Sequence, residues 1–252
     1  MIALILAAGY ATRLYPLTIN TPKPLLPVGP KPMIDYITDE IDTLPDVSKI
    51  IVVTNHRFAS QFEEWAGKRM SEGRLIPIEI VDDGTTDDTN KLGAIGDIQF
   101  VIDKYAIDED FMIIAGDNLF TYKLRDMYDF FMEKRRDTLV AIRVEDVEQL
   151  KKLAVATLDE DNKVLHLAEK PALPRSTVAI YATYFYLRET LPLFRQYLDE
   201  GNTPDAPGNF PSWLYTRKDV YAFRAPGTCV DIGTPENYKE VCDNYKEILG
   251  LK

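Results

Sequence analysis

The sequence predicts an α/β fold around a mixed, mostly parallel β-sheet. In the first half of the chain, short apolar runs typical of buried strands alternate with amphipathic helical segments. Such alternation indicates parallel strands joined by right-handed crossovers. After residue 137 strands become frequent and helices shorter, which predicts a smaller α+β part. No linker separates the two parts, so we expect one domain over 1–252, with halves 1–136 and 137–252.

In the first half, residues 1–8 read as a buried strand. Residues 34–44 read as a helix, because Ile34, Ile37, Ile41 and Leu44 recur at helical spacing. The remaining segments of this half are strands over 49–54, 75–81 and 111–115, helices over 58–70, 92–101 and 124–134, and a loop over 82–90. The segments expected in the second half are strands over 138–144, 153–158, 164–167 and 179–186, a turn over 159–162, and helices over 188–198 and 238–249.

Composition limits the classes of function. Of 252 residues, 46% are hydrophobic and 27% charged, which suits a globular chain with a sizeable core. The formal net charge of −11 argues against nucleic-acid binding through a broad basic surface, although a few cations can still dominate a cleft for a small anion. The two cysteines form no CxxC pair, which predicts no zinc site and a cytoplasmic location. The apolar runs are too short for a membrane span or a signal peptide.

Candidate ligand-binding residues fall at the ends of predicted strands, where open α/β sheets bind ligands. Gly9 follows the first strand and has no Cβ, so backbone N–H groups there can approach a phosphate. We expect Arg13 and Lys23 to converge on one polyphosphate, Arg13 as a planar fork and Lys23 as a point charge. The loop that begins at Asp82 and the residue Asp117 follow two further strands.

Two isolated aspartates, Asp117 and Asp231, suit a Mg²⁺ ion that also binds substrate phosphates, although each could instead shape a turn. Lys170 follows a strand end beside Glu169 and could meet a second anion, or the two could form a solvated pair. Tyr181 reads as core packing that could also line a pocket. Neither a GxxxxGK(S/T) loop nor a GxGxxG motif is present, which removes the main support for P-loop and dinucleotide-binding enzymes.

Together these segments resemble the sugar-1-phosphate nucleotidylyltransferases, most nearly the glucose-1-phosphate thymidylyltransferases and related nucleotide-sugar pyrophosphorylases. The resemblance spans nearly the whole chain and rests on LAAGYATRL at 6–14, PKPLLPV at 22–28, GDN at 116–118, EKP at 169–171 and DIGT at 231–234. It implies the Rossmann-like, three-layer nucleotide-diphospho-sugar transferase fold. Its implied partners are an NTP and a sugar 1-phosphate, with no nucleic acid and no membrane, and a homo-oligomer stays open.

The resemblance also implies a role for each candidate residue. Arg13 and Lys23 would be catalytic, with Arg13 gripping the departing phosphates and Lys23 the α-phosphate. The nucleotide-binding residues would be Leu6, Ala7, Ala8, Gly9, Tyr10, Asp82, Gly93 and Asp117, with Gly93 as the glycine that the base approaches closely. The sugar-phosphate-binding residues would be Asn118, Glu169, Lys170 and Tyr181, and the Mg²⁺ ligands would be Asp117 and Asp231.

The implied reaction is Mg²⁺-dependent transfer of a nucleotidyl group from an NTP, dTTP or UTP favoured, to a sugar 1-phosphate, with release of pyrophosphate. The sequence departs from the family pattern at Asp82-Asp83, Leu153-Ala154, Tyr181-Ala182 and Cys229, so the base and the sugar stay open. Three competing functions remain open: cytidylyl or guanylyl transfer to another phosphorylated acceptor, a glycosyltransferase of related fold, and a non-catalytic nucleotide-sugar-binding regulatory subunit.

Overall fold

A computed structural model describes residues 1–74 and 76–250, except for the side chain of Asp231. Within these residues the centre is a nine-stranded sheet in the order β10-β9-β11-β6-β1-β4-β5, with β8 paired to β11 and β12 paired to β8. The bounds are β1 Ile2–Leu6, β4 Lys49–Thr54, β5 Ile78–Asp82, β6 Phe111–Ala115, β8 Asp137–Arg143, β9 Ala154–Leu158, β10 Val164–Glu169, β11 Val178–Tyr186 and β12 Val220–Arg224. Neighbours among β6, β1, β4 and β5 pair in parallel, whereas β11 pairs antiparallel with β6, β8 and β9.

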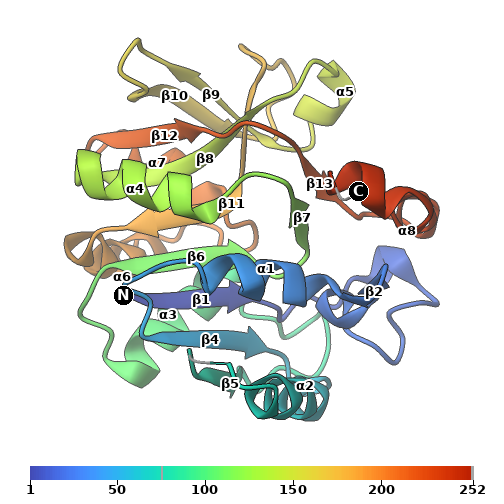
Figure 1. Ribbon diagram of the computed structural model, residues 1–252. Helices are drawn as coiled ribbons and strands as arrows, with labels where there is room; N and C mark the ends of the chain where they lie inside the picture. The colour runs from blue at the N-terminus through green and yellow to red at the C-terminus, as the bar shows by residue number, and fades with distance from the viewer. Residues whose placement is uncertain (75, 251–252) are drawn as a thin grey trace.

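Helices cover both faces of the sheet and complete three layers (Figure 1). One core cluster packs Ile37, Phe62 and Phe131 against one face, and a second packs Ile98 and Phe194 against the other. The bounds are α1 Met33–Ile41, α2 Ala59–Ser71, α3 Ala94–Tyr105, α4 Leu124–Lys134, α5 Val147–Leu150, α6 Leu191–Asp199, α7 Asn209–Leu214 and α8 Pro235–Ile248. The predicted α/β class with a mostly parallel sheet is therefore confirmed.

The long strand β11 joins the two halves of the chain in one sheet. Its first residues pair with β9 and its last residues with β6, and its register with β8 shifts between Tyr181 and Tyr184. The sheet thus runs through position 137 without a break, and the division into halves there stays a prediction.

A smaller ladder brings the C-terminal segment to the carboxyl edge of the parallel strands (Figure 1). Strands β7 (Asn118–Phe120) and β13 (Cys229–Asp231) pair antiparallel, with Asp231 opposite Asn118. Helix α8 follows and begins after Thr234, whose Oγ1 accepts a hydrogen bond from the N–H of Asn237. The Tyr238 hydroxyl donates to the carbonyl of Pro27 at 2.6 Å, which fixes α8 against the hairpin of β2 (Pro27–Val28) and β3 (Lys31–Pro32).

Several predicted bounds were wrong for identifiable reasons. The first strand ends at Leu6, where the chain leaves the sheet at its carboxyl edge. The helix predicted over 34–44 ends at Ile41. The strand predicted over 75–81 begins at Ile78, and Leu75 lies outside the described residues. A 3₁₀ turn over Arg188–Thr190 precedes α6, which has a proline in its first turn. Strands β12 and β13 and helix α5 were not predicted.

None of the helices in the described part of the chain combines the length and apolar character that crossing a membrane requires.

Candidate functional site

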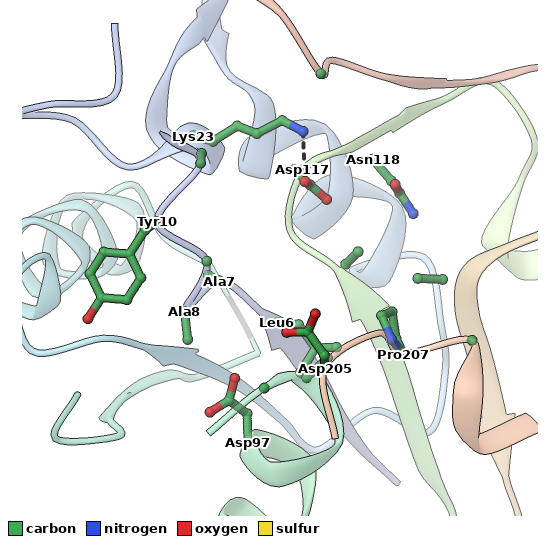
Figure 2. Close-up of a pocket in the computed structure, with 18 of the residues that line it drawn as sticks. Leu6, Ala7, Ala8, Tyr10, Lys23, Asp97, Asp117, Asn118, Asp205 and Pro207 are labelled. Atoms are coloured by element: carbon green, nitrogen blue, oxygen red, sulfur yellow. Dashed lines mark hydrogen bonds and ion pairs between the residues drawn. The ribbon is translucent and has the colours of Figure 1, made fainter. Parts of the chain in front are cut away.

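A cleft of about 520 Å³ opens at the carboxyl ends of the parallel strands. The turn after β1, the loop after β5 and the start of α3 form one end, where Asp205 also lies, and β9, β10, β11 and Gly208 form the other. Figure 2 shows the side chains of Lys23 and Asp117 pointing toward each other. The predicted site residues that line the cleft are Leu6, Ala7, Ala8, Gly9, Tyr10, Arg13, Lys23, Gly93, Asp117, Asn118, Glu169 and Tyr181.

The turn after β1 is anchored on one side and open on the other. The N–H of Ala7 donates to the carbonyl of Val53, and Asn55 Nδ2 donates to the carbonyl of Ala8, both at 2.9 Å. At Gly9 an added Cβ would meet no protein atom within 4 Å. The missing side chain therefore leaves room in the cleft itself, as a turn that approaches a phosphate requires.

Arg13 follows a backbone turn in an unusual conformation. Ala11 has a φ of 47°, in the left-handed region that non-glycine residues rarely adopt, and Thr18 Oγ1 donates to its carbonyl at 2.8 Å. This residue precedes the 3₁₀ turn over Thr12–Leu14, in which Leu14 is buried and Arg13 exposed. Arg13 lines the cleft and makes no hydrogen bond or ion pair with any residue that the structure describes, so its guanidinium is available to an anion.

Lys23 and Asp117 form an ion pair at the centre of the cleft (Figure 2). Lys23 Nζ donates to Asp117 Oδ2 at 2.7 Å, and the Lys23 side chain is only 8% exposed. Burial raises the pKa of Asp117, but the charge and hydrogen bond of Lys23, with a further contribution from Arg13, outweigh it and leave this pKa below its ordinary value. Asp117 is therefore an ionised carboxylate that fixes the direction of the Lys23 ammonium.

The residues around Asp117 fit a Mg²⁺ ion. Lys23 contacts Oδ2 of Asp117, and the Asp117 side chain is still 36% exposed. The main chain of Asp231 lies opposite Asn118, the residue that follows Asp117. No group of three or more His, Cys, Asp or Glu side chains placed to hold a metal occurs among the described residues. A metal here would therefore need substrate oxygens, and Mg²⁺ commonly binds through one or two carboxylates with substrate phosphates.

The opposite end of the cleft is built around Glu169. Burial raises the pKa of Glu169, and the charge of Lys170 opposes this, with Lys170 Nζ 3.7 Å from Glu169 Oε1. An added Cβ at Gly208 would lie 2.0 Å from Glu169 Oε2, so a side chain here would push this carboxyl group out of its present position. Asn118 Nδ2 is buried and has no hydrogen-bond partner among the described residues, and Tyr181 is buried in the wall. Lys170 itself is 58% exposed and lies outside the lining of the cleft.

Of the two residues predicted to face a base, Asp82 and Gly93, only Gly93 lines the cleft. Asp82 lies outside the lining of the cleft, and its Oδ2 is 2.6 Å from Nδ1 of His56. This hydrogen bond, and then the charge of Asp82, raise the pKa of His56. Gly93 has a φ of 78°, and an added Cβ would lie 2.7 Å from the carbonyl oxygen of Pro204. Only glycine fits between this turn and the segment at Pro204, and Gly93 also lines the cleft, so its approach to a base stays a prediction.

Among the lining residues that sequence reasoning missed are Asp97, Lys152, Asp205 and Gly208. A signal existed for Asp97, since an aspartate beside Ile98 on the buried face of an amphipathic helix breaks the expected pattern. The other three lie in short connections without periodicity, where only the folded chain shows what they face.

An open glycine turn, an Arg13 without a partner among the described residues and the oriented Lys23 lie at the carboxyl edge of parallel strands, an arrangement typical of α/β proteins that bind phosphates. The profile of the nucleotidyl transferase family matches residues 2–248, and the chain belongs to this family.

Comparison with known proteins agrees with this membership. The chain is 26% identical over 252 residues to a glucose-1-phosphate adenylyltransferase of Geobacillus stearothermophilus, covering 95% of this chain and 64% of that protein. It is also 26% identical over 251 residues to a UTP–glucose-1-phosphate uridylyltransferase of Haloferax volcanii, covering 98% and 97%. A crystal structure of UDP-glucose pyrophosphorylase with UDP-glucose matches with a TM-score of 0.80 at 20% identity over 98% of both chains. This likeness confirms the predicted fold, although the chain spans only 64% of the length of several curated relatives.

Proposed function

We propose that the chain transfers a nucleotidyl group from an NTP, with UTP or dTTP favoured, to a sugar 1-phosphate and releases pyrophosphate. The observation that carries the proposal is the convergence on one cleft of the open Gly9 turn, the Lys23–Asp117 pair and Arg13, which has no partner within the described part of the chain. The names of the relatives add support for the reaction class, since they describe adenylyl and uridylyl transfer to glucose 1-phosphate. Those names differ in the base, so the choice of UTP or dTTP rests on the resemblance alone.

The nucleotide belongs at the end of the cleft formed by the turn after β1. Ala7 to Tyr10 would hold it, with the N–H groups near Gly9 close to the phosphates. Arg13 would grip the departing β- and γ-phosphates, because its planar fork matches two oxygens at once. Lys23 would neutralise the α-phosphate, since Asp117 already holds its ammonium in the cleft.

The acceptor belongs at the end formed by β9, β10 and β11. The unpartnered amide of Asn118 can donate to an acceptor oxygen, and Glu169 can accept from a sugar hydroxyl. Lys170 is an exposed ammonium beside Glu169, and we assign it to the phosphate of the sugar. Tyr181 would form part of the wall against the sugar ring.

The chemistry then needs positioning and charge neutralisation but no general base. An oxygen of the acceptor phosphate, already anionic, forms a bond to the α-phosphorus of the NTP. The bond from that phosphorus to the bridging oxygen of pyrophosphate breaks, and its electron pair leaves on pyrophosphate. Arg13 and Lys23 stabilise the growing charge on the leaving group and the α-phosphate. A Mg²⁺ ion held by Asp117 and Asp231 would supply further neutralisation of the same phosphates.

Pyrophosphate release tests the proposal. Each NTP is incubated with Mg²⁺ and a panel of sugar 1-phosphates, and the phosphate formed by added pyrophosphatase is measured with malachite green. We expect pyrophosphate only when both substrates are present, with UTP or dTTP giving the highest rate. NTP binding without turnover across the panel would overturn the proposal in favour of a regulatory nucleotide-sugar-binding subunit.

Two further arms of the assay test for a different acceptor and for glycosyl transfer. CTP and GTP with small alcohol phosphates test a different acceptor, and product from these alone would replace the sugar 1-phosphate. NDP release from an NDP-sugar and an acceptor sugar, without pyrophosphate formation from NTP, would indicate a glycosyltransferase instead.

A further inference from the structure

Two carboxyl groups that line the nucleotide end of the cleft, those of Asp97 and Asp83, interact with each other. Asp97 lies on the first turns of α3 and is only 5% exposed, and Asp83 follows β5. Both line the cleft, and Figure 2 shows the Asp97 carboxyl on the side of the turn that carries Ala8 and Tyr10. Oδ1 of Asp97 is buried and has no hydrogen-bond partner among the described residues. An ionised carboxylate left in this state would be strongly unfavourable.

Asp83 connects this pair to the turn that would hold the nucleotide. Its Oδ1 accepts from both the N–H and the hydroxyl of Thr85, each at 2.7 Å. Because the Thr85 hydroxyl donates to Asp83, its oxygen accepts from the Tyr10 hydroxyl, 3.2 Å away. The N–H of Asp83 donates to the carbonyl of Thr54 at the end of β4. A continuous chain of contacts thus runs from Asp97 through Asp83 and Thr85 to Tyr10.

A shared proton can hold the two carboxyl groups together. Burial, followed by the charge and hydrogen bond of Asp83, raises the pKa of Asp97 to about 8. The other charged or titratable groups that line this end of the cleft are Asp88, Lys91, Asp205 and Tyr10, and beside them lie Asp87, Arg57 and the His56–Asp82 pair. Lys91 does not compensate Asp97, because its ammonium is already paired with Asp88 at 3.4 Å and Asp205 at 3.0 Å.

We propose that Asp97 is a positioning residue for NTP binding, which in its protonated form donates a hydrogen bond to Asp83 and thereby holds the loop after β5 and Tyr10 in place. When Asp97 loses this proton, the two carboxylates repel each other and the loop separates from α3. NTP binding then weakens, whereas the acceptor end of the cleft is unaffected. The inference rests on the proposed function in one respect, namely that the nucleotide binds at the Tyr10 end.

Direct binding of UTP with Mg²⁺, measured by calorimetry without an acceptor between pH 6.5 and 9.5, tests this inference. The dissociation constant should rise about tenfold between pH 7 and pH 9, because only the protonated fraction is competent to bind. In Asp97→Asn the amide N–H donates to Asp83 at every pH, so this variant should keep the affinity seen at pH 7 and lose the alkaline rise. Asp97→Leu cannot form the bridge and should bind weakly at every pH.

Asp103→Asn provides the matched control, because Asp103 lies on the same helix but outside the lining of the cleft. It should keep the wild-type pH profile. The His56–Asp82 pair beside the loop is unchanged in both Asp97→Asn and Asp103→Asn, so any contribution of this pair to the pH dependence of UTP binding is the same in the two variants.

An alkaline rise that persists in Asp97→Asn, or a wild-type profile that is flat, would overturn the inference. Absence of UTP binding at every pH would do the same. The proposed function is judged separately by pyrophosphate release. The expected binding profile without turnover would leave Asp97 as a positioning residue of a nucleotide-binding protein that is not a transferase.

Discussion

The two ends of the cleft are built in different ways. The nucleotide end consists of consecutive strand ends in one parallel sheet, where β1, β4, β5 and β6 deliver short turns side by side. The acceptor end combines antiparallel strands with Gly208, which lies far along the chain. The first design depends on local motifs that each follow a strand, whereas the second depends on long-range packing. We therefore expect that reaction chemistry and acceptor choice can be altered independently.

The same contrast is seen in how polar groups are held. At the nucleotide end Lys23 is fixed by the ionised Asp117. At the acceptor end the placement of Glu169 depends on the absence of a side chain at Gly208, a residue in another segment. Substitutions at the nucleotide end should therefore change the chemical step, and those at the acceptor end should change acceptor binding.

The largest effect is expected from Arg13→Ala. This change removes a guanidinium that makes no hydrogen bond or ion pair within the described protein, so the fold should be intact. We expect kcat to fall about 10²- to 10³-fold, the usual loss when one group that stabilises transition-state charge is removed. Steady-state pyrophosphate release measures kcat, and circular dichroism checks the fold. Arg13→Lys keeps the charge without the fork and should recover only part of the rate. A folded Arg13→Ala protein with full activity would contradict the assignment.

Lys23→Met should reduce both activity and stability. It leaves Asp117 without its partner, and because this carboxylate is partly exposed we expect a loss of about 1–2 kcal/mol in the free energy of unfolding. Since Lys23 lowers the pKa of Asp117 in the folded state, its stabilising effect is present at neutral pH and is lost as the pH falls through that lowered pKa. The difference from wild type in urea unfolding should therefore shrink below about pH 4.

The double variant Lys23→Met/Asp117→Asn separates the two roles of the pair. It removes the unpaired charge, so stability should recover while kcat stays low. Recovery of activity in this variant would show that Lys23 serves only to neutralise Asp117.

These residues also show how far the sequence could predict the site. Gly9 with Arg13, and Asp117, follow buried strands, and parallel strands bring their carboxyl ends to one edge, so strand prediction gathers them. Lys23 follows no strand, so its convergence with Arg13 was a hypothesis from charge alone. The contact of Gly208 with Glu169 could not be predicted, because it depends on how the end of β10 packs against a distant connection. The bounds of β4, β6 and α4 were predicted correctly, since each is a continuous apolar run or a clear amphipathic helix. Strand β13 is only three residues long and has no periodicity to detect.

A pair of matched glycine substitutions sharpens the comparison between the two ends. At Gly9 an added Cβ meets no protein atom, so Gly9→Ala should leave stability intact and occupy space meant for the NTP. We expect the KM for NTP to rise about tenfold, which corresponds to about 1–2 kcal/mol of overpacking. The KM for the acceptor should stay unchanged, as measured by varying each substrate in the pyrophosphate assay.

Gly208→Ala should give the opposite result. Its Cβ would displace Glu169, so the KM for the acceptor should rise and that for NTP stay unchanged. Stability should fall by about 1–3 kcal/mol from overpacking. Adding Glu169→Asp shortens the displaced side chain and should restore stability. Equal effects of the two glycine variants on both KM values would show that the two ends are not independent.

The smallest effect is expected at Ala11, where the nucleotide end stores backbone strain. A non-glycine residue at a φ of 47° costs about 1–2 kcal/mol, and glycine would relieve this while adding freedom to the unfolded chain. The two contributions nearly cancel, so Ala11→Gly should raise the free energy of unfolding by only about 0.5 kcal/mol. Ala11→Val should lower it, because a β-branched side chain tolerates this conformation less well than alanine. Urea unfolding measures both, and kcat should change less than twofold in Ala11→Gly because Arg13 keeps its position after the turn. A lower free energy of unfolding in Ala11→Gly would contradict this expectation. It would show that contacts of the Ala11 methyl group stabilise the left-handed turn before Arg13 by more than the backbone strain costs.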